Sequence, residues 1–221
     1  MQVSGKYLKS IYDELFRHYG DLSCPLNHES SFQLTVAVVL SAQCRDDRVN
    51  LVTAKLFEKY PTPEAMAEAT AAEIAPYLQQ LGLYQAKAKY LHGIAEKIVC
   101  DFGGEVPKSM AELLTLPGVG RKSANVILGN GFGIPGFPVD THVRRLAGRL
   151  GLSKHTAPEK IEADITGKIP SEYWTNFSHL LIHHGRQCCN ARKPECEKCF
   201  LKNYCLERSV GMKKTSKVKN K

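Results

Sequence analysis

The stretch LPGVGRKSANV, residues 116–126, places positive charge directly after two glycines. Residues 109–114 before it and the residues from Arg121 onward are both expected to be helical, so the stretch predicts a tight hairpin between two helices. We expect Gly118 and Gly120 to permit positive φ angles and a close approach of the backbone to a ligand. The second helix would present unpaired N–H groups to an anion such as a DNA phosphate. A G-x-G pair alone equally fits a helix C-cap followed by a turn.

The rest of the chain also has helical periodicity, and no convincing period-two run is present, so we predict an all-α fold. Gly20 is expected to end the first helix and Pro61 the third, and Thr62-Pro63 supplies a cap and a first helical position for the next. The expected helices cover residues 7–16, 32–43, 46–60, 71–81, 85–102, 109–114, 141–149, 157–168 and 171–183, with further starts at 63 and 121.

A loop rich in glycine and proline, NGFGIPGFPVDTH at 130–142, interrupts this helical pattern. Its three glycines and two prolines forbid a continuous helix. The loop therefore predicts a crossing between two lobes. The last ten residues, MKKTSKVKNK at 212–221, are expected to form a disordered basic tail that is available to phosphates.

The charge balance favours a polyanionic partner. The 30 Lys and Arg residues exceed the 22 Asp and Glu residues and give a formal net charge of +8 over 221 residues, which suits nucleic acid or an anionic membrane surface. No stretch approaches the roughly 18 uninterrupted apolar residues of a membrane span, and the N-terminus has no signal-peptide pattern. We therefore expect an intracellular protein of the cytoplasm or nucleoid, with no membrane contact.

Eight cysteines in a reducing compartment favour a metal site over a disulfide framework. Four of them form a C-x6-C-x2-C-x5-C pattern: Cys189, Cys196, Cys199 and Cys205. A zinc ribbon usually has two C-x2-C pairs, whereas four thiolates on one compact loop favour a 4Fe-4S cluster, with zinc as the main alternative. Cys188 is a competing first ligand. The isolated cysteines are expected to be small buried hydrophobic residues: Cys24, Cys44 and Cys100.

Several motifs together resemble the endonuclease III family, the DNA glycosylases and AP lyases of the helix-hairpin-helix, Gly/Pro-Asp superfamily. The motifs are LSAQ at 40–43, GLY at 82–84, GEVP at 104–107, LPGVGRKSANV at 116–126, VDTH at 139–142, HGR at 184–186, ARKP at 191–194 and the cysteine spacing. The resemblance implies a six-helix barrel carrying the hairpin at 22–134, and a helical iron-sulfur lobe at 1–21 and 135–211 with the cluster loop at 189–205. It also implies an active site in the cleft between the two lobes.

The same resemblance assigns roles to individual residues. Lys122 falls on the catalytic lysine and Asp140 on the catalytic aspartate, and we expect Asp140 also to cap the helix that follows it. Gln43 and Leu83 match residues that enter the DNA helix and fill the gap left by a flipped base. The resemblance also makes Cys189 the first cluster ligand in preference to Cys188.

Further contacts with DNA are expected around these positions. The turn Gly118-Val119-Gly120 and Arg121 would hold a phosphate, and the basic loop with Arg192 and Lys193 is either a second phosphate contact or a solvated turn. His142 and Arg145 are expected to contact phosphate, to position Asp140, or to have a purely structural role. His183 and His184 are expected to pack and form hydrogen bonds near the cluster without binding metal.

The resemblance implies a bifunctional enzyme of base excision DNA repair. Lys122 would be made neutral in part by burial and by the helix N-terminus, and its amine would displace a damaged base. The expected target is an oxidised or ring-saturated pyrimidine. A Schiff base between the lysine and the sugar would then lead to strand cleavage by β-elimination. The expected partner is duplex DNA with a damaged base or abasic site, bound by a monomer. A monofunctional glycosylase and a non-catalytic DNA-binding module are the alternatives, and the presence of Lys122 and Asp140 disfavours both. Two pairs depart from the family pattern and were expected to line the lesion pocket: Cys44-Arg45 and Gly136-Phe137.

Overall fold

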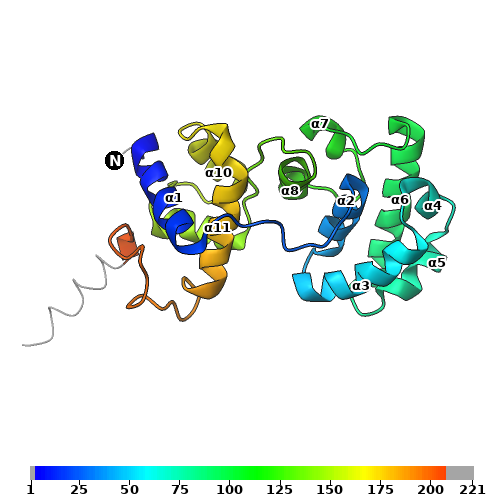
Figure 1. Cartoon of the computed structure of the whole chain (residues 1–221), viewed down its shortest axis with the longest axis horizontal. Coiled ribbons are helices and arrows are strands. Elements are labelled where there is room, and N and C mark those ends of the chain that lie inside the picture. Colours follow the sequence, from blue (N-terminus) through cyan, green and yellow to red (C-terminus); the bar gives the residue numbers. More distant parts are fainter. Residues whose placement is uncertain (1–2, 208–221) are drawn as a thin grey trace, which may run out of the picture. The chain divides into compact units, whose positions relative to one another are not determined.

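The chain is helical throughout the described part, residues 3–207 of a computed structural model (Figure 1). Every regular element in that range is an α-helix or a 3-10 helix, which confirms the all-α prediction. The tail at 212–221, expected to be disordered, lies outside the described residues. Among residues 3–207, no helix combines the length and the apolar character that crossing a membrane requires.

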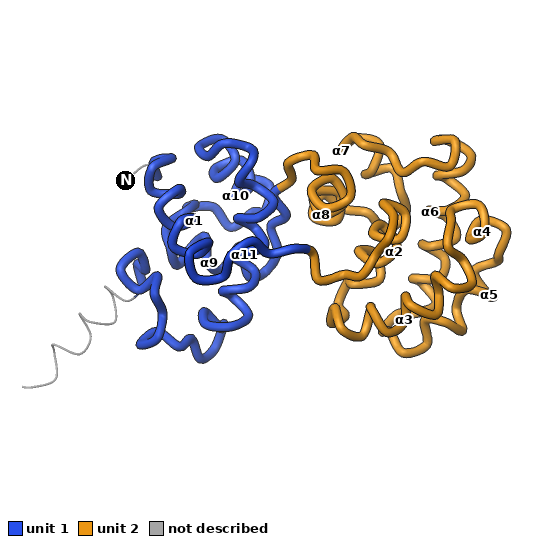
Figure 2. The backbone as a smooth tube through the Cα atoms, in the orientation of Figure 1, with its two compact units in different colours: residues 1–23, 137–221 blue, residues 24–136 orange. Residues whose placement is uncertain are grey.

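Contacts within the chain define two compact units (Figure 2). Unit 1 combines the described residues up to 23 with those from 137 onward, and unit 2 comprises residues 24–136. Each unit has its own apolar core. The N-terminal helix therefore belongs with the C-terminal part of the chain, and unit 2 is a continuous insertion between them.

Unit 1 is built around its longest C-terminal helix. α11 (Trp174–Gln187) packs against α1 (Gly5–Tyr19) and α9 (Thr141–Arg149), and α10 (Pro158–Thr166) packs against α9. A short 3-10 helix, η2 (Ser171–Tyr173), precedes α11. Phe137 and Phe177 are fully buried in the core between these helices.

Unit 2 surrounds an almost completely buried helix, α2 (Ser31–Leu40). Its neighbours are α3 (Asp46–Lys59), α6 (Tyr84–Phe102) and α8 (Arg121–Gly131). Shorter elements complete the unit: α4 (Pro63–Ala67), α5 (Ala71–Ile74), η1 (Ala75–Leu78) and α7 (Met110–Leu113). The burial of α2 on all sides agrees with its uninterrupted apolar sequence.

Local sequence signals account for most helix boundaries. The hydroxyl groups of Ser30 and Thr62 accept hydrogen bonds from backbone N–H groups of the first turns of α2 and α4, which satisfies donors that the helix itself leaves unpaired. Several boundaries differ from the prediction: the helix expected over 171–183 is a 3-10 helix over Ser171–Tyr173 and an α-helix over Trp174–Gln187. The helix expected over 71–81 changes to 3-10 geometry after Ile74, where Pro76 lacks an N–H group. The helix expected to reach Gln43 ends at Leu40.

Burial of the isolated cysteines differs from the expectation. Cys24 and Cys44 are half-buried and pack against the core of unit 2, but Cys100 is exposed. The prediction was wrong for Cys100 because it lies on the solvent-facing side of α6.

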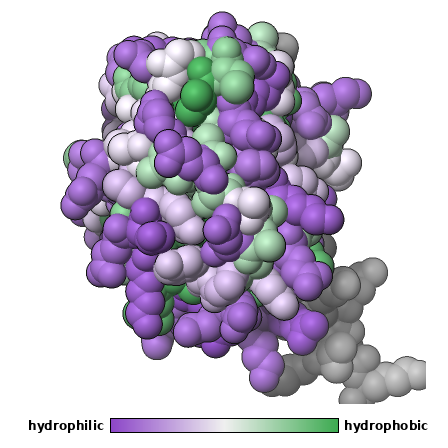
Figure 3. Space-filling view, turned by 90° about the vertical axis from the view of Figure 1, so that its right-hand side faces the viewer, coloured by the Kyte–Doolittle hydropathy of each residue, from purple (hydrophilic) through white to green (hydrophobic). Residues whose placement is uncertain are grey.

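The face of the molecule seen in Figure 3 is predominantly hydrophilic, with apolar residues only in small groups.

Candidate active site and cysteine centre

The predicted hairpin lies in unit 2 and is closed by its own backbone. The Val119 N–H donates to the Leu116 carbonyl (3.1 Å), and α8 begins at Arg121. Gly118 has a φ of 74°, and a Cβ at this position would lie 3.1 Å from ring atoms of Tyr90. The left-handed backbone and the contact with the ring both favour glycine at 118.

Gly120 has a different part in the hairpin from the one expected. Its φ is −99°, so the expected positive φ is wrong at this position. Gly120 is the N-cap of α8 and provides no side-chain cap. A glycine N-cap leaves the start of α8 without a capping side chain from this residue, and the start of a helix is a position where an anion can bind.

Lys122 is the second residue of α8 and its side chain is exposed. The partial burial expected for this lysine is therefore wrong, because the first turn of α8 presents it to solvent.

Asp140 is the N-cap of α9 in unit 1, as predicted. Its Oδ1 accepts hydrogen bonds from the backbone N–H groups of His142 (2.7 Å) and Val143 (2.8 Å). The segment before it is anchored by the buried Ser178 hydroxyl, which donates to the Pro138 carbonyl (2.7 Å). Both cap bonds use the same carboxylate oxygen, so Oδ2 is left for other chemistry.

Phe137 was expected to line a lesion pocket and does not. Its side chain is fully buried and packs edge-on against Phe177, with ring centroids 6.0 Å apart. Gly136 has a packing role in unit 2, because a Cβ there would lie 2.4 Å from the Asn125 carbonyl oxygen. This pair supports the backbone that leads to Asp140.

Arg145 connects α9 to the end of α11 and the start of the cysteine loop. Its Nε donates to the Cys189 carbonyl (3.0 Å), and its Nη2 donates to the Gly185 carbonyl (2.9 Å) and lies 3.1 Å from His142 Nδ1. Of the roles predicted for Arg145, these internal contacts support the structural one. The same helix carries Asp140 at its start, so the loop and the aspartate share one support.

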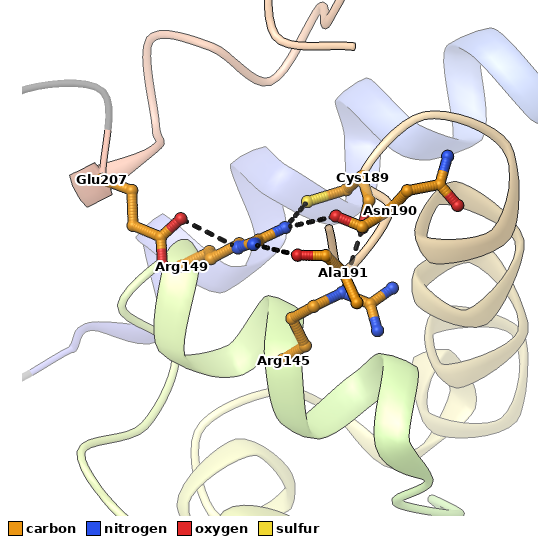
Figure 4. A network of polar contacts seen from close by, with 6 residues as sticks. All are labelled: Arg145, Arg149, Cys189, Asn190, Ala191 and Glu207. Carbon is orange, nitrogen blue, oxygen red and sulfur yellow. Dashed lines mark hydrogen bonds and ion pairs between the residues drawn. The ribbon is translucent and has the colours of Figure 1, made fainter. Parts of the chain in front are cut away.

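Arg149, one turn further along α9, holds the cysteine loop directly (Figure 4). Its Nη1 donates to Cys189 Sγ (3.3 Å) and to the Asn190 carbonyl (2.9 Å), and its Nη2 donates to the Ala191 carbonyl (3.3 Å). Its Nε also forms an ion pair with Glu207 (2.9 Å). The guanidinium therefore joins the two ends of the loop to α9.

The four predicted cluster ligands line one cavity of unit 1 with a volume of about 420 Å³. Cys189, Cys196, Cys199 and Cys205 all contribute to its wall, together with Cys188 and His184. Burial raises the pKa of the Cys199 thiol to about 12, so a metal that binds it must displace a firmly held proton. The number and chemistry of these sulfur ligands fit a 4Fe-4S cluster.

His184 lies closer to the sulfurs than expected. Its Nε2 is 3.4 Å from Cys199 Sγ, and its Nδ1 is 2.8 Å from the Tyr19 hydroxyl. One ligand atom from each of His184, Cys188 and Cys199 falls within 4.8 Å of the others. Burial lowers the pKa of His184 to about 4, so the ring is neutral at neutral pH. His183 makes an edge contact with the Tyr19 ring, with centroids 4.7 Å apart.

Gln43 and Leu83 lie at two exposed turns of unit 2. Leu83 is 69% exposed, an unusual environment for a leucine. Gln43 lines a pocket of about 470 Å³, with Cys44, Arg45 and Arg48 among the other residues of its wall. The departures from the family pattern at 44 and 45 therefore lie beside Gln43.

Two further findings concern basic residues. Arg192 and Lys193 are both exposed on the cysteine loop, as either of the two roles predicted for them requires. Lys87 is buried behind Gln43, with 4% of its surface exposed, and was missed in the sequence. In the sequence it is a lysine in a helix, three residues after the GLY motif, and nothing local separates it from an exposed lysine. Its burial is visible only in the fold.

Comparison with known proteins places these features in a family. Residues 36–171 match the profile described as "HhH-GPD superfamily base excision DNA repair protein". The endonuclease III of Synechocystis sp. is 50% identical over 188 residues, which cover 85% of this chain and 86% of that protein. The chain belongs to the endonuclease III family. Members of this family are DNA glycosylases and AP lyases, and this chain is such an enzyme of base excision repair.

Solved structures of endonuclease III share the fold over nearly the whole chain. A structure of a non-covalent endonuclease III–DNA complex is 38% identical, with a TM-score of 0.89, and covers 96% of this chain and 99% of its own. A trapped endonuclease III–DNA covalent intermediate gives the same identity and TM-score, and covers 95% of this chain and 99% of its own. The resemblance stated from the motifs is thereby confirmed.

Proposed function

We propose that this endonuclease III family member removes oxidised or ring-saturated pyrimidines from duplex DNA, with Lys122 as the nucleophile. The observation that carries the proposal is the exposed Lys122 side chain, one residue beyond the start of α8 and two residues beyond its glycine N-cap. A phosphate bound at that position would fix the DNA backbone next to the amine. The covalent endonuclease III–DNA intermediate among the similar structures supports the same chemistry here.

The reaction begins at C1′ of the flipped nucleotide. The neutral amine of Lys122 attacks C1′, the bond from C1′ to the base breaks, and the base leaves with the bonding electrons and takes up a proton. Loss of the amine protons and opening of the sugar ring give a Schiff base between Lys122 and C1′. The Schiff base acidifies the C2′ proton, and its removal expels the phosphate on the 3′ side by β-elimination.

Asp140 assists by accepting a proton from Lys122 and by stabilising positive charge on the sugar in the transition state. Its Oδ1 is held by the first turn of α9 through two backbone N–H groups. Those bonds fix the orientation of the carboxylate, and Oδ2 takes the proton. Because a carboxylate near an ammonium stabilises the charged amine, its benefit lies in the transition state rather than in the free enzyme.

The flipped base leaves a gap in the helix, and we assign Gln43 and Leu83 to fill it. Extruding a nucleotide costs a few kcal/mol, and side chains that enter the stack offset part of that cost. The exposed positions of both residues at turns of unit 2 support this role. Arg121, Arg192 and Lys193 would add sequence-independent contacts with phosphates.

We also propose that a 4Fe-4S cluster is held by Cys189, Cys196, Cys199 and Cys205, on the strength of the shared cavity and its sulfur ligands. When bound, the cluster would cross-link the loop that Arg149 and Arg145 hold against α9. Iron and acid-labile sulfide in the purified protein, in a ratio near one to one, would support this assignment. Zinc in protein prepared without oxygen would contradict it.

Borohydride trapping tests the lyase chemistry directly, because the reagent reduces the Schiff base to a stable amine. Wild-type protein should form a covalent complex with duplex DNA that contains an abasic site, and Lys122→Ala should form none. Lys160→Ala, which removes another exposed lysine on α10, is the matched control and should trap as well as wild type. Equal trapping by Lys122→Ala would overturn the assignment. Excision from duplexes with a ring-saturated pyrimidine, compared with an oxidised purine, tests the substrate class.

A further inference from the structure

Two turns of unit 2 share an uncommon backbone conformation. Gln43 has a φ of 57° and Leu83 a φ of 59°, and among residues 3–207 no other non-glycine residue has a positive φ. Residues other than glycine rarely adopt this left-handed backbone conformation. It persists only where surrounding contacts hold the backbone in place. These are the two residues that the proposed function places inside the DNA helix.

The side chain of Lys87 holds the first of these turns. Its Nζ donates to the carbonyls of Leu40 (2.9 Å) and Ala42 (3.0 Å) and to Cys44 Sγ (3.1 Å). An ammonium group has three N–H donors, and these three acceptors match them. Ala42 and Cys44 are the neighbours of Gln43, so the ammonium fixes the chain on both sides of it.

The main chain of Lys87 holds the second turn. Its N–H donates to the Leu83 carbonyl (3.0 Å), which closes the first turn of α6. Leu83 is the N-cap of this helix and provides no side-chain cap. Lys87 is therefore bonded to both turns, one through its ammonium group and the other through its backbone.

The contacts of Lys87 also explain why α2 ends before Gln43. The carbonyls of the last turn of a helix lack partners within the helix, and a positive charge at that end is favourable. The Lys87 ammonium binds one such carbonyl, that of Leu40, and then the carbonyl of Ala42 beyond the helix. A buried charge is costly unless its hydrogen bonds are satisfied, so the turn is constrained to keep these acceptors in place.

We propose that Lys87 is a positioning residue whose ammonium group holds Gln43 in the conformation with which it enters the DNA helix, from a helix whose first turn begins at Leu83. This inference rests on the proposed function of those two residues. It adds a residue that contacts neither the sugar nor the base. Without the ammonium group, the chain around Gln43 samples other conformations, and the gap left by the flipped base is filled less often.

The test uses the full-length protein with its metal centre and compares Lys87→Met with Lys89→Met. Methionine keeps a long apolar side chain and removes the charge, and Lys89 is an exposed lysine on the same helix. The probe is a duplex with an abasic-site analogue beside 2-aminopurine, whose fluorescence rises when it is unstacked. The second measurement is the single-turnover rate of base excision from a damaged duplex.

For Lys87→Met we expect most of the fluorescence rise to be lost and excision to slow by about tenfold or more. Lys89→Met should match wild type in both measurements. Borohydride trapping on a single-stranded abasic oligonucleotide should stay within about twofold of wild type for both variants, because a single strand has no gap to fill. Equal loss of trapping on the single strand would show a general defect and overturn the positioning role.

The outcomes separate this inference from the proposed function. If wild-type protein neither excises nor traps, the proposed function fails. If wild type is active and Lys87→Met matches it in fluorescence and excision, the inference about Lys87 is overturned. If Lys87→Met does not fold, Lys87→Arg is tested instead. Arginine keeps the charge, but its planar guanidinium cannot direct three N–H groups from one nitrogen to the three acceptors. A loss of about threefold or more in both measurements supports the role, and wild-type values overturn it.

Discussion

The hairpin in unit 2 and the cysteine loop in unit 1 are held in different ways. The hairpin is closed by backbone bonds between residues close in sequence, such as that from Val119 to Leu116. The cysteine loop has no regular element from 188 to 205 among the described residues. It is held by α9 through Arg145 and Arg149, about forty residues earlier in the chain.

Because of this difference, a substitution in the hairpin should have local effects, whereas one that affects the cysteine loop can act from a distant part of the chain. A substitution in the hairpin should change a small number of backbone angles and leave the rest of unit 2 intact. A substitution in the loop or its supports should release a longer segment, because the loop contains only separate turns, such as the one closed by the bond from the Glu195 N–H to the Cys188 carbonyl (2.9 Å), and no regular element. Four substitutions test that contrast, and Cys199→Ser has the largest expected effect and Gly120→Ala the smallest.

Cys199→Ser should have the largest effect. Loss of this half-buried proposed ligand should abolish the visible absorbance of an iron-sulfur cluster. It should also lower the free energy of unfolding of unit 1 by several kcal/mol, since metal-binding energy contributes to folding. Cys100→Ser, an exposed cysteine outside the loop, is the control and should change neither. Full absorbance in Cys199→Ser would show that another residue serves as ligand.

Arg149→Met should weaken the loop without removing a ligand. The substitution leaves the carbonyls of Asn190 and Ala191 without their donor, which costs about 1–3 kcal/mol. Chemical denaturation should show this loss, and the cluster should be lost faster to a chelator. Arg144→Met removes an exposed arginine from the same helix and should leave both measurements unchanged. Equal behaviour of the two variants would argue against the support given by Arg149.

Gly118→Ala should cost less and act on the hairpin alone. An alanine at φ 74° is strained and its Cβ meets the Tyr90 ring, so we expect a loss of about 1–2 kcal/mol in the free energy of unfolding. Affinity for abasic-site duplex should fall with it, because the turn proposed to bind a phosphate is distorted. The visible absorbance should not change. A loss of absorbance in this variant would show that the two regions are coupled.

Gly120→Ala should have the smallest effect on stability. The residue has a φ of −99° and no atom lies within 4 Å of the position a Cβ would take. We expect a change within about 0.5 kcal/mol in the free energy of unfolding. A large destabilisation would mean that the backbone at 120 differs from the one described. The pair Gly118→Ala and Gly120→Ala thus separates two glycines that look equivalent in the sequence.

The sequence predicted those features that depend on neighbouring residues. Thr62 and Asp140 were expected to cap helices and do so, because a side-chain oxygen needs to reach only two or three residues along the chain. The cysteine spacing indicated a metal site, and the four proposed ligands line one cavity. The residues that give such signals lie close together in the sequence, so the signals can be recognised without knowledge of the fold.

The features that the sequence did not predict depend on contacts between distant segments. The early end of α2 and the burial of Lys87 follow from bonds between residue 87 and residues 40–44. The exposure of Cys100 and of Lys122 depends on which faces of α6 and α8 pack inward. None of these outcomes is set by local propensity.

By itself, the sequence determined the helical fold, the hairpin, the cysteine pattern and the family, because periodicity, turn residues and motif spacing are local properties of the chain. The tertiary structure alone decided which glycine of the hairpin needs a positive φ, which arginines hold the cysteine loop and which lysine supports Gln43. Those roles arise where side chains far apart in sequence share one set of hydrogen bonds, and only packing brings them together.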